Sequence, residues 1–232
     1  LPEVKEALKD KKPLLALEST ILAQGMPYPD NLDFAEQATR IVKEQGVVPA
    51  TIAIISGIAH IGLSKEAIVQ LVKNPETRKV ARRDIPWIMQ KGLHGATTVS
   101  ATMHLAHLAG IQVFATGGIG GVHRDVEKSY DISQDLEALA TTPMIVISAG
   151  AKAILDIPKT LEVLETLSVS VIGYQNNEFP AFYSRQSGCL LEQRLDSPKE
   201  IAELHIRRQG LNLFASLLVA NPIPIGDEIP AS

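Results

Sequence analysis

Six short apolar runs, separated by segments with helical spacing, constrain the fold of this chain more than any other feature. Each run has the length of a strand and is rich in Leu, Ile and Val, as in strands buried on both faces. Strands that alternate with helices predict crossover connections and a mostly parallel sheet covered on both sides. We therefore expect an α/β fold with three α/β/α layers. The runs span residues 14–17, 51–55, 113–115, 145–148, 171–174 and 217–219.

Helix start and stop signals lie between these runs. Ser64, Ser133 and Ser197 each precede a helical segment, in the position where a serine hydroxyl caps the first turn. Gly46 and Gly110 follow helical segments, where glycine readily adopts the left-handed conformation that ends a helix. We therefore predict helices over residues 31–45, 64–72, 98–108, 134–140, 158–167 and 197–208.

Composition narrows the class of protein. The chain has 232 residues, of which 45% are hydrophobic and 21% are charged, so it can bury a sizeable core as one domain. A net charge of −4 argues against a nucleic-acid partner. The single cysteine, Cys189, excludes an internal disulfide and a thiolate metal cluster. With no apolar run of membrane length and a charged, amphipathic start, we expect a cytoplasmic protein without a membrane partner.

The residues that follow the apolar runs are the first candidates for a site, because ligands of such sheets bind at the carboxyl ends of the strands. Glu18 follows the first run, the glycine-rich segment 116–124 follows the third, and Lys152 follows the fourth. We expect them to meet at one sheet edge. The glycine segment lacks the spacing of a dinucleotide-binding loop, and it either brings backbone amides close to a ligand or only forms a tight turn.

Lys152 has the most reactive side chain of this group. A lysine beside an apolar layer loses hydration, which lowers its pKa, and a neutral amine is a nucleophile for carbonyl-like carbons. The alternative is a lysine at a strand end that turns outward into water.

Two segments suit an anion. Lys79, Arg82 and Arg83 place three cations close together, as a phosphate clamp or as an ordinary solvated face. Thr98 and Val99 begin a predicted helix, whose first amides form a second anion site. Together these segments favour a phosphorylated substrate.

Asp131 precedes the Ser133 cap, where its carboxylate is free to bind a cation. Oxygen ligands without thiolates suit magnesium or manganese rather than zinc. His123 either assists or is a hydrogen-bonded packing residue, and Asp135 is also explained as a first-turn carboxylate favoured by the helix dipole. We interpret His104 and His107 as packing or surface residues.

A resemblance to a known family is carried by eight runs, at residues 16–20, 25–27, 48–53, 82–84, 95–99, 114–124, 149–152 and 220–224. Together these runs resemble the pseudouridine-5′-phosphate glycosidase family, also called the indigoidine-synthase-A-like family. The resemblance implies an α/β/α homotrimer that uses a divalent metal, typically manganese. It also implies reversible cleavage of the carbon–carbon glycosidic bond of pseudouridine 5′-phosphate to uracil and ribose 5-phosphate.

The resemblance also implies roles for particular residues. Lys152 would be the nucleophile and Glu18 the proton donor, and an imine would form between Lys152 and the opened sugar. Asp131 would bind the metal. The substrate would contact Lys79, Val99 through its backbone, Ser133, Gln134 and Asp135.

The family has a C-terminal helical stretch that finds no counterpart in this chain. We therefore expect a single pseudouridine-5′-phosphate glycosidase-like domain over residues 1–232, shorter than the family at its C-terminus. Two alternatives stay open: another lysine-imine lyase or aldolase acting on phosphosugars, and a non-catalytic protein that binds the phosphorylated nucleoside.

Overall fold

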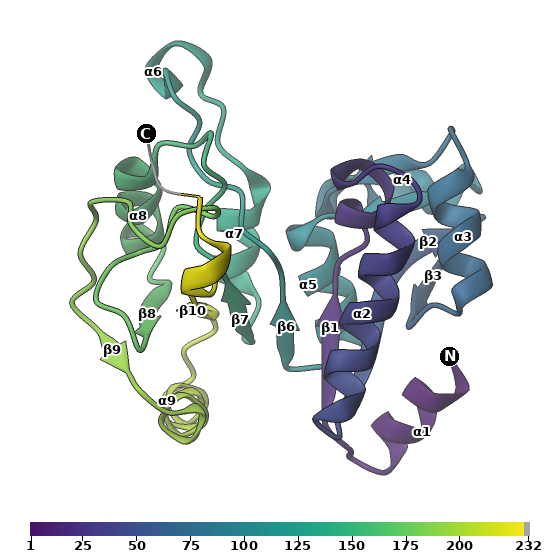
Figure 1. Ribbon diagram of the computed structural model, residues 1–232, viewed down its shortest axis with the longest axis horizontal. Helices are drawn as coiled ribbons and strands as arrows, with labels where there is room; N and C mark the ends of the chain where they lie inside the picture. Colours follow the sequence, from purple (N-terminus) through teal and green to yellow (C-terminus); the bar gives the residue numbers. More distant parts are fainter. Residues whose placement is uncertain (230–232) are drawn as a thin grey trace. The chain divides into compact units, whose positions relative to one another are not determined.

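The computed structural model describes residues 1–229 and divides into two compact units, Leu1–Phe114 and Ala115–Ser232 (Figure 1). Strand β6 (Val113–Ala115) contains the boundary between them. The prediction of a single domain over residues 1–232 stays a prediction, and its last three residues lie outside the described part.

The first unit is built around the long strand β2 (Val48–Ile55), which is buried along nearly its whole length. Strand β1 (Leu14–Leu17) lies parallel to one side of it, with Leu14 opposite Val48. Strand β5 (Gly95–Thr97) lies antiparallel to it and carries the parallel edge strand β4 (Arg78–Val80). Strand β3 (Ile58–Ile61) returns antiparallel to β2 as a hairpin.

Five α-helices surround these strands. Helices α2 and α3 pack apolar side chains of one face into a core cluster that includes Ala35, Ile68 and Leu71. Helix α5 is buried along most of its length, as its mainly apolar sequence requires. The helices are α1 (Pro2–Lys9), α2 (Asp30–Glu44), α3 (Lys65–Lys73), α4 (Ile85–Gln90) and α5 (Val99–Leu108), with shorter turns at Ile21–Gly25 and Arg82–Asp84.

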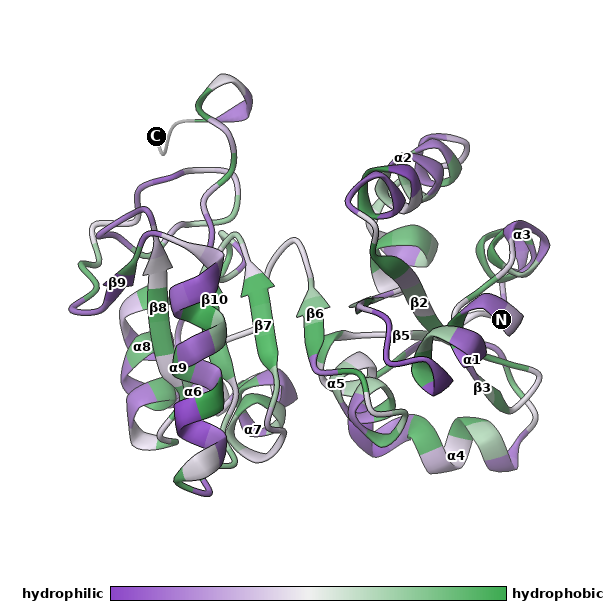
Figure 2. Cartoon of the chain, turned by 90° about the horizontal axis from the view of Figure 1, so that it is seen from below, coloured by the Kyte–Doolittle hydropathy of each residue, from purple (hydrophilic) through white to green (hydrophobic). Residues whose placement is uncertain are grey.

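The second unit has an all-parallel strand order of β7, β10, β8 and β9. Figure 2 shows β7, β10 and the middle of β8 as strongly hydrophobic, in contrast to the hydrophilic residues on α9. The strands are β7 (Ile145–Ser148), β8 (Ser170–Tyr174), β9 (Arg194–Leu195) and β10 (Leu217–Ala220). The helices are α6 (Val126–Ser129), α7 (Gln134–Thr141), α8 (Ile157–Thr166) and α9 (Pro198–Gly210), and a short turn covers Ile225–Asp227.

The predicted helix caps are confirmed. The hydroxyl of Ser64 accepts from the Ala67 amide, and the hydroxyl of Ser133 accepts from the Asp135 amide. Ser197 and Glu200 form a reciprocal capping box at the start of α9. Helix α8 begins one residue earlier than predicted, because the Asp156 carboxylate caps it by accepting from the Lys159 amide.

The mostly parallel sheet with flanking helices confirms the predicted α/β/α class. Across residues 1–229, no helix combines the length and apolar character needed to cross a bilayer.

Candidate functional site

The predicted site residues fall into two sets, one in each unit. Glu18, Lys79 and Val99 belong to the first unit, whereas Lys152 and the segment 131–135 belong to the second. Because Glu18 and Lys152 belong to different units, the expectation that they lie at one sheet edge stays a prediction.

In the second unit, the glycine-rich loop runs beside the segment that carries Lys152. The Thr116 amide donates to the Ile147 carbonyl, and the Ala149 amide donates to the Gly117 carbonyl at 3.1 Å. Farther along, the Ile119 amide donates to the Gly150 carbonyl at 3.0 Å, and the Lys152 amide donates to the Ile119 carbonyl at 3.1 Å. A parallel ladder therefore continues past the end of β7 and fixes the backbone of Lys152 against the loop.

The ladder also sets the direction of the Lys152 side chain. Ile119 and Ala151 are bridge partners, and both are fully buried. Because successive residues of paired segments point to opposite faces, Lys152 leaves on the other face, which Gly118 and Gly120 leave without side chains. The side chain is half-buried, and within residues 1–229 its ammonium has no hydrogen bond or ion pair.

Ser133 and Asp135 occupy the same face above Gly120. The Gly120 amide donates to Asp135 Oδ2 at 2.8 Å, and the Ser133 amide donates to the Gly121 carbonyl at 2.9 Å. A Cβ atom at Gly120 would lie 2.7 Å from Asp135 Oδ2, so glycine is needed for this approach. The structure thus brings Lys152, Ser133 and buried Asp135 to one face, and Gln134 follows Ser133 as the first residue of α7.

The far end of the glycine loop is fastened to the start of α8. The Val122 amide donates to Thr160 Oγ1 at 2.9 Å, and the Asp156 amide donates to the Val122 carbonyl at 2.8 Å. Hydrogen bonds from the Lys159 backbone and side chain lower the pKa of Asp156. The anionic cap therefore stabilises the helix end to which the loop is attached.

Asp131 and His123 face each other across a short antiparallel pairing. The His123 amide donates to the Asp131 carbonyl at 3.0 Å, and His123 Nε2 lies 3.8 Å from Asp131 Oδ2. Both side chains are accessible. The described residues contain no group of three or more possible metal-ligating side chains, so this pair offers at most two side-chain donors to a cation. A pair of donors fits an ion that keeps most of its water, as Mg²⁺ and related hard cations do.

A loop that sequence reasoning missed completes this face. Phe182 packs its ring against Gly118, where an added Cβ atom would lie 2.8 Å from Phe182 Cε2. The Phe182 amide donates to the Ala149 carbonyl at 3.0 Å, and Ala181 bridges Gly150. The pairs of neighbouring glycines in 117–121 were the only sequence signal of such a close approach.

The same unit has an open cavity of about 990 Å³. Its lining includes Arg124, Asp156, Glu178 and Tyr183, and none of the predicted site residues. We assign it no role in the site.

In the first unit, Glu18 follows β1 directly and is half-buried. Its neighbour Ser19 is fully buried, donates to the Ile52 carbonyl at 2.6 Å and accepts from the Thr97 amide at 2.9 Å. The Thr97 hydroxyl also donates to the Ile52 carbonyl, and Thr102 donates to Thr97. Buried hydroxyls therefore hold the backbone at the position of Glu18.

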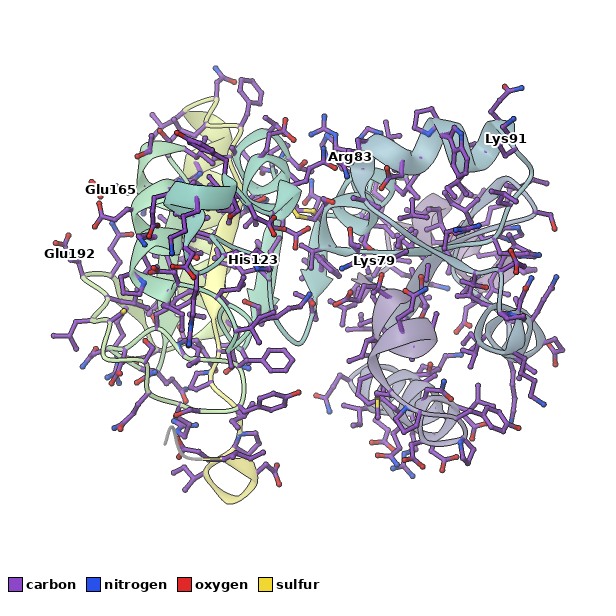
Figure 3. The ribbon with its side chains drawn as sticks, turned by 90° about the horizontal axis from the view of Figure 1, so that it is seen from above. Lys79, Arg83, Lys91, His123, Glu165 and Glu192 are labelled. Atoms are coloured by element: carbon purple, nitrogen blue, oxygen red, sulfur yellow. The ribbon has the colours of Figure 1, made fainter. Side chains whose placement is uncertain are left out.

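Within this unit, a backbone hydrogen bond connects the strand that carries Lys79 to the start of the helix that begins at Val99. Lys79 is exposed on edge strand β4, and the next residue, Val80, accepts from the Thr98 amide at 2.9 Å (Figure 3). Val99 is the first residue of α5, where N–H groups have no partner inside the helix. The Arg82 amide donates to Ser100 Oγ at 3.3 Å, which places the cationic turn Arg82–Asp84 beside the same helix start.

The fold and sequence have close counterparts among known proteins. The family model described as "Indigoidine synthase A like protein" matches residues 3–232. The chain is 54% identical to a pseudouridine-5′-phosphate glycosidase of Paracoccus denitrificans over 99% of this chain and 76% of that protein. It is 53% identical to one of Caldanaerobacter subterraneus over 96% of this chain and 72% of that protein.

Two solved structures are similar over most of the chain. The prealnumycin C-glycosynthase AlnA, solved in complex with ribulose 5-phosphate, has a TM-score of 0.92 at 36% identity, covering 99% of this chain and 74% of that one. An indigoidine synthase A-like protein of Thermotoga maritima has a TM-score of 0.90 at 36% identity, covering 94% and 73%. Sequence and fold agree, and the chain belongs to the indigoidine synthase A-like family.

Proposed function

We propose that this protein is a pseudouridine-5′-phosphate glycosidase, which cleaves the carbon–carbon bond between uracil and ribose reversibly. The observation that carries the proposal is the placement of Lys152 on one face with Ser133 and Asp135, next to a loop whose glycines leave that face without side chains. An accessible amine with room for a substrate carbon suits covalent catalysis. The names of the relatives, and the sugar phosphate bound by AlnA, support the same substrate class.

The chemistry needs a nucleophile because the atom that leaves the sugar in a carbon–carbon glycosidic bond is a carbon, so there is no leaving heteroatom to protonate. Glu18 donates a proton to the ribose ring oxygen as that oxygen leaves the anomeric carbon. Conjugation with uracil makes the anomeric carbon electrophilic, and the Lys152 amine adds to it. A proton then reaches the uracil carbon, the bond to the sugar breaks, and the nitrogen lone pair forms an imine. Water hydrolyses the imine to ribose 5-phosphate and frees the amine.

The substrate is held away from the reacting carbon. Lys79 supplies a point charge for the phosphate, and the backbone of Val99 supplies an amide at a helix start. Ser133, Gln134 and Asp135 supply hydrogen-bonding groups. Binding energy from the phosphate is then available to orient the open sugar while the bonds change.

Asp131 is the proposed ligand of a divalent cation, most simply Mn²⁺, with His123 beside it. When bound, such an ion supplies positive charge that stabilises developing negative charge and orders water. We further propose a cytoplasmic homotrimer, supported by the family and by the single cysteine of the chain. Native mass spectrometry with and without Mn²⁺ tests the assembly.

Uracil release from pseudouridine 5′-phosphate tests the function. The intact chain with Mn²⁺ should release uracil, Lys152→Ala should abolish the release, and Lys199→Ala should not change it, because Lys199 is largely exposed on α9. Turnover of ribose 5-phosphate aldol adducts without uracil release would favour the alternative lyase or aldolase. Binding of the nucleotide without any release would favour a non-catalytic protein.

A further inference from the structure

We propose that Phe182 forms the stacking surface for the pyrimidine ring of the substrate. This inference rests on the proposed function and names a residue that determines base binding at the same site. The observations are the backbone conformation of Phe182, the position of its ring and the apolar, half-exposed character of that ring.

The backbone of Phe182 is held in an unusual conformation. Its φ angle is +64°, in the left-handed region that bulky side chains rarely adopt. Two hydrogen bonds fix this backbone conformation: the Phe182 amide donates to the Ala149 carbonyl, and the Ala181 amide donates to the Ser184 carbonyl at 2.8 Å. Such conformations concentrate at functional sites, where the surroundings hold a side chain in a required place.

Three glycines allow the loop that carries Phe182 to approach both the glycine-rich loop and the segment that carries Lys152. The ring lies against Gly117 and Gly118, where Cβ atoms would meet its Cε2 atom at 3.4 Å and 2.8 Å. Gly150 has a φ of +82°, and an added Cβ there would meet the Pro180 backbone. A larger residue at Gly118 would displace the ring, and one at Gly150 would displace the Pro180 backbone.

The ring and the lysine share one face of the ladder. Gly118 and Lys152 both lie opposite the face of Ile119 and Ala151, so the ring above Gly118 is on the side toward which Lys152 projects. The ring is half-buried, which leaves aromatic surface accessible beside the amine. Ser133 and Asp135 stand over Gly120 on the same face and supply polar groups next to it.

These positions match the two ends of the substrate bond. The amine attacks the anomeric carbon, and the base attached to that carbon needs a flat surface within a few ångströms. Aromatic side chains stack on nucleic-acid bases without requiring a particular hydrogen-bond pattern. The edge-to-face contact of Tyr183, with ring centroids 4.5 Å apart, keeps the Phe182 ring in one orientation.

The test uses the reverse reaction, in which uracil and ribose 5-phosphate are supplied separately. Phe182→Leu should raise the KM for uracil about tenfold or more, the effect of removing one aromatic–base stack. The KM for ribose 5-phosphate, and borohydride trapping of ribose 5-phosphate on the enzyme, should stay within about twofold of wild type. Phe182→Tyr should restore the uracil KM, and the matched control Phe214→Leu, at an exposed position of the same unit, should have no effect.

The outcomes separate this inference from the proposed function. If Phe182→Leu lowers trapping and uracil use together, or leaves the uracil KM unchanged in a working enzyme, the stacking role is wrong and the ring only braces the loop. If wild type neither traps ribose 5-phosphate nor uses uracil, the proposed function itself is wrong. If Phe182→Leu does not fold, Phe182→Tyr still tests the inference, because it keeps the aromatic ring and should therefore keep the wild-type KM for uracil.

Discussion

The surroundings of Lys152 and those of Glu18 are built in opposite ways. Around Lys152, backbone hydrogen bonds between the glycine loop and the segment after β7 do the positioning, and glycines keep the space open. Around Glu18, buried side-chain hydroxyls of Ser19, Thr97 and Thr102 do it. The proposed nucleophile therefore lies where added atoms would collide, and the proposed acid lies where the loss of a hydroxyl would remove hydrogen bonds.

This difference follows from the chemistry proposed for each residue. A nucleophilic lysine must admit a substrate carbon, so its surroundings need empty volume that only glycine leaves. A proton donor needs a fixed direction more than space, and bonded hydroxyls hold a strand end rigidly. The comparison predicts that added atoms disrupt the region around Lys152, whereas lost hydrogen bonds disrupt the region around Glu18.

After the loss of uracil release in Lys152→Ala, the largest effect is expected for Glu18→Gln. The amide keeps the size of the side chain and removes the acidic proton, so kcat for uracil release should fall about 10²–10⁴-fold, the usual contribution of a general acid. The unfolding temperature should not change. Glu76→Gln, at an exposed position of the same unit, is the control. Wild-type kcat in Glu18→Gln would remove Glu18 from the mechanism.

Gly120→Ala tests the region around Lys152. The added methyl group would lie 2.7 Å from Asp135 Oδ2 and would collide with Ser133, so the loop must move. A shift of about 1 Å at the site costs about 100-fold in kcat. Gly210→Ala should leave kcat unchanged, because nothing lies within 4 Å of the added atom. Equal behaviour of the two alanine variants would contradict the claim that this face needs its empty volume.

Ser19→Ala tests the hydroxyl cluster. Removal of its Oγ leaves the Thr97 amide without that acceptor and the Ile52 carbonyl with one donor fewer. The free energy of unfolding should fall by about 1–3 kcal/mol, measured by urea denaturation. Thr166→Ala, which removes an exposed hydroxyl that bonds the Glu162 carbonyl, should change it by less than about 0.5 kcal/mol. A negligible loss in Ser19→Ala would mean that these hydroxyls do not fix the strand end.

The smallest effect concerns the pH dependence of stability and compares one histidine of each unit, His205 and His104. Burial lowers the pKa of His205, with a smaller contribution from Arg208, and burial with Arg82 lowers the pKa of His104. The folded protein therefore binds these protons less tightly than the unfolded chain does. Their stability contribution is complete above pH about 6.5 and decreases as the pH falls toward the lowered pKa values.

The melting temperature of wild type should thus fall between pH 8 and pH 5.5, and His205→Leu should reduce that fall by about 2 °C. His104→Leu should reduce it less, because His205 is 7% exposed and His104 is only half-buried. The leucine variant removes no hydrogen bond from the described residues, since neither ring nitrogen of His205 has a partner there. A larger reduction of the fall in melting temperature in His104→Leu than in His205→Leu would contradict this ranking of the two histidines.

The sequence predicted the strands whose side chains are buried. All six apolar runs lie within observed strands, because continuous burial forces continuous apolar composition. The edge strand β4 escaped detection because Arg78 and Lys79 point to solvent, and β5 because Gly95 and Ala96 have too little apolar surface to form a pattern. Strand β9 is only two residues long.

The strand-end rule predicted that Lys152 lies beside the glycine-rich loop, and the structure places it there. Ser133 and Asp135 lie against Gly120 of the same loop, and the roles of all three residues stay predictions. Phe182 could not be found, because its position depends on a long-range hydrogen bond to the Ala149 carbonyl and on the absence of side chains at Gly118 and Gly150. No local pattern in the sequence encodes contacts between segments that lie so far apart.

The most direct test of the account is borohydride reduction in the presence of ribose 5-phosphate, followed by peptide mass mapping. Reduction of the imine should leave one pentose phosphate attached to Lys152, and the adduct should disappear in Lys152→Ala but remain in Lys199→Ala. An adduct on another lysine, or full uracil release from Lys152→Ala, would contradict the assignment of the nucleophile.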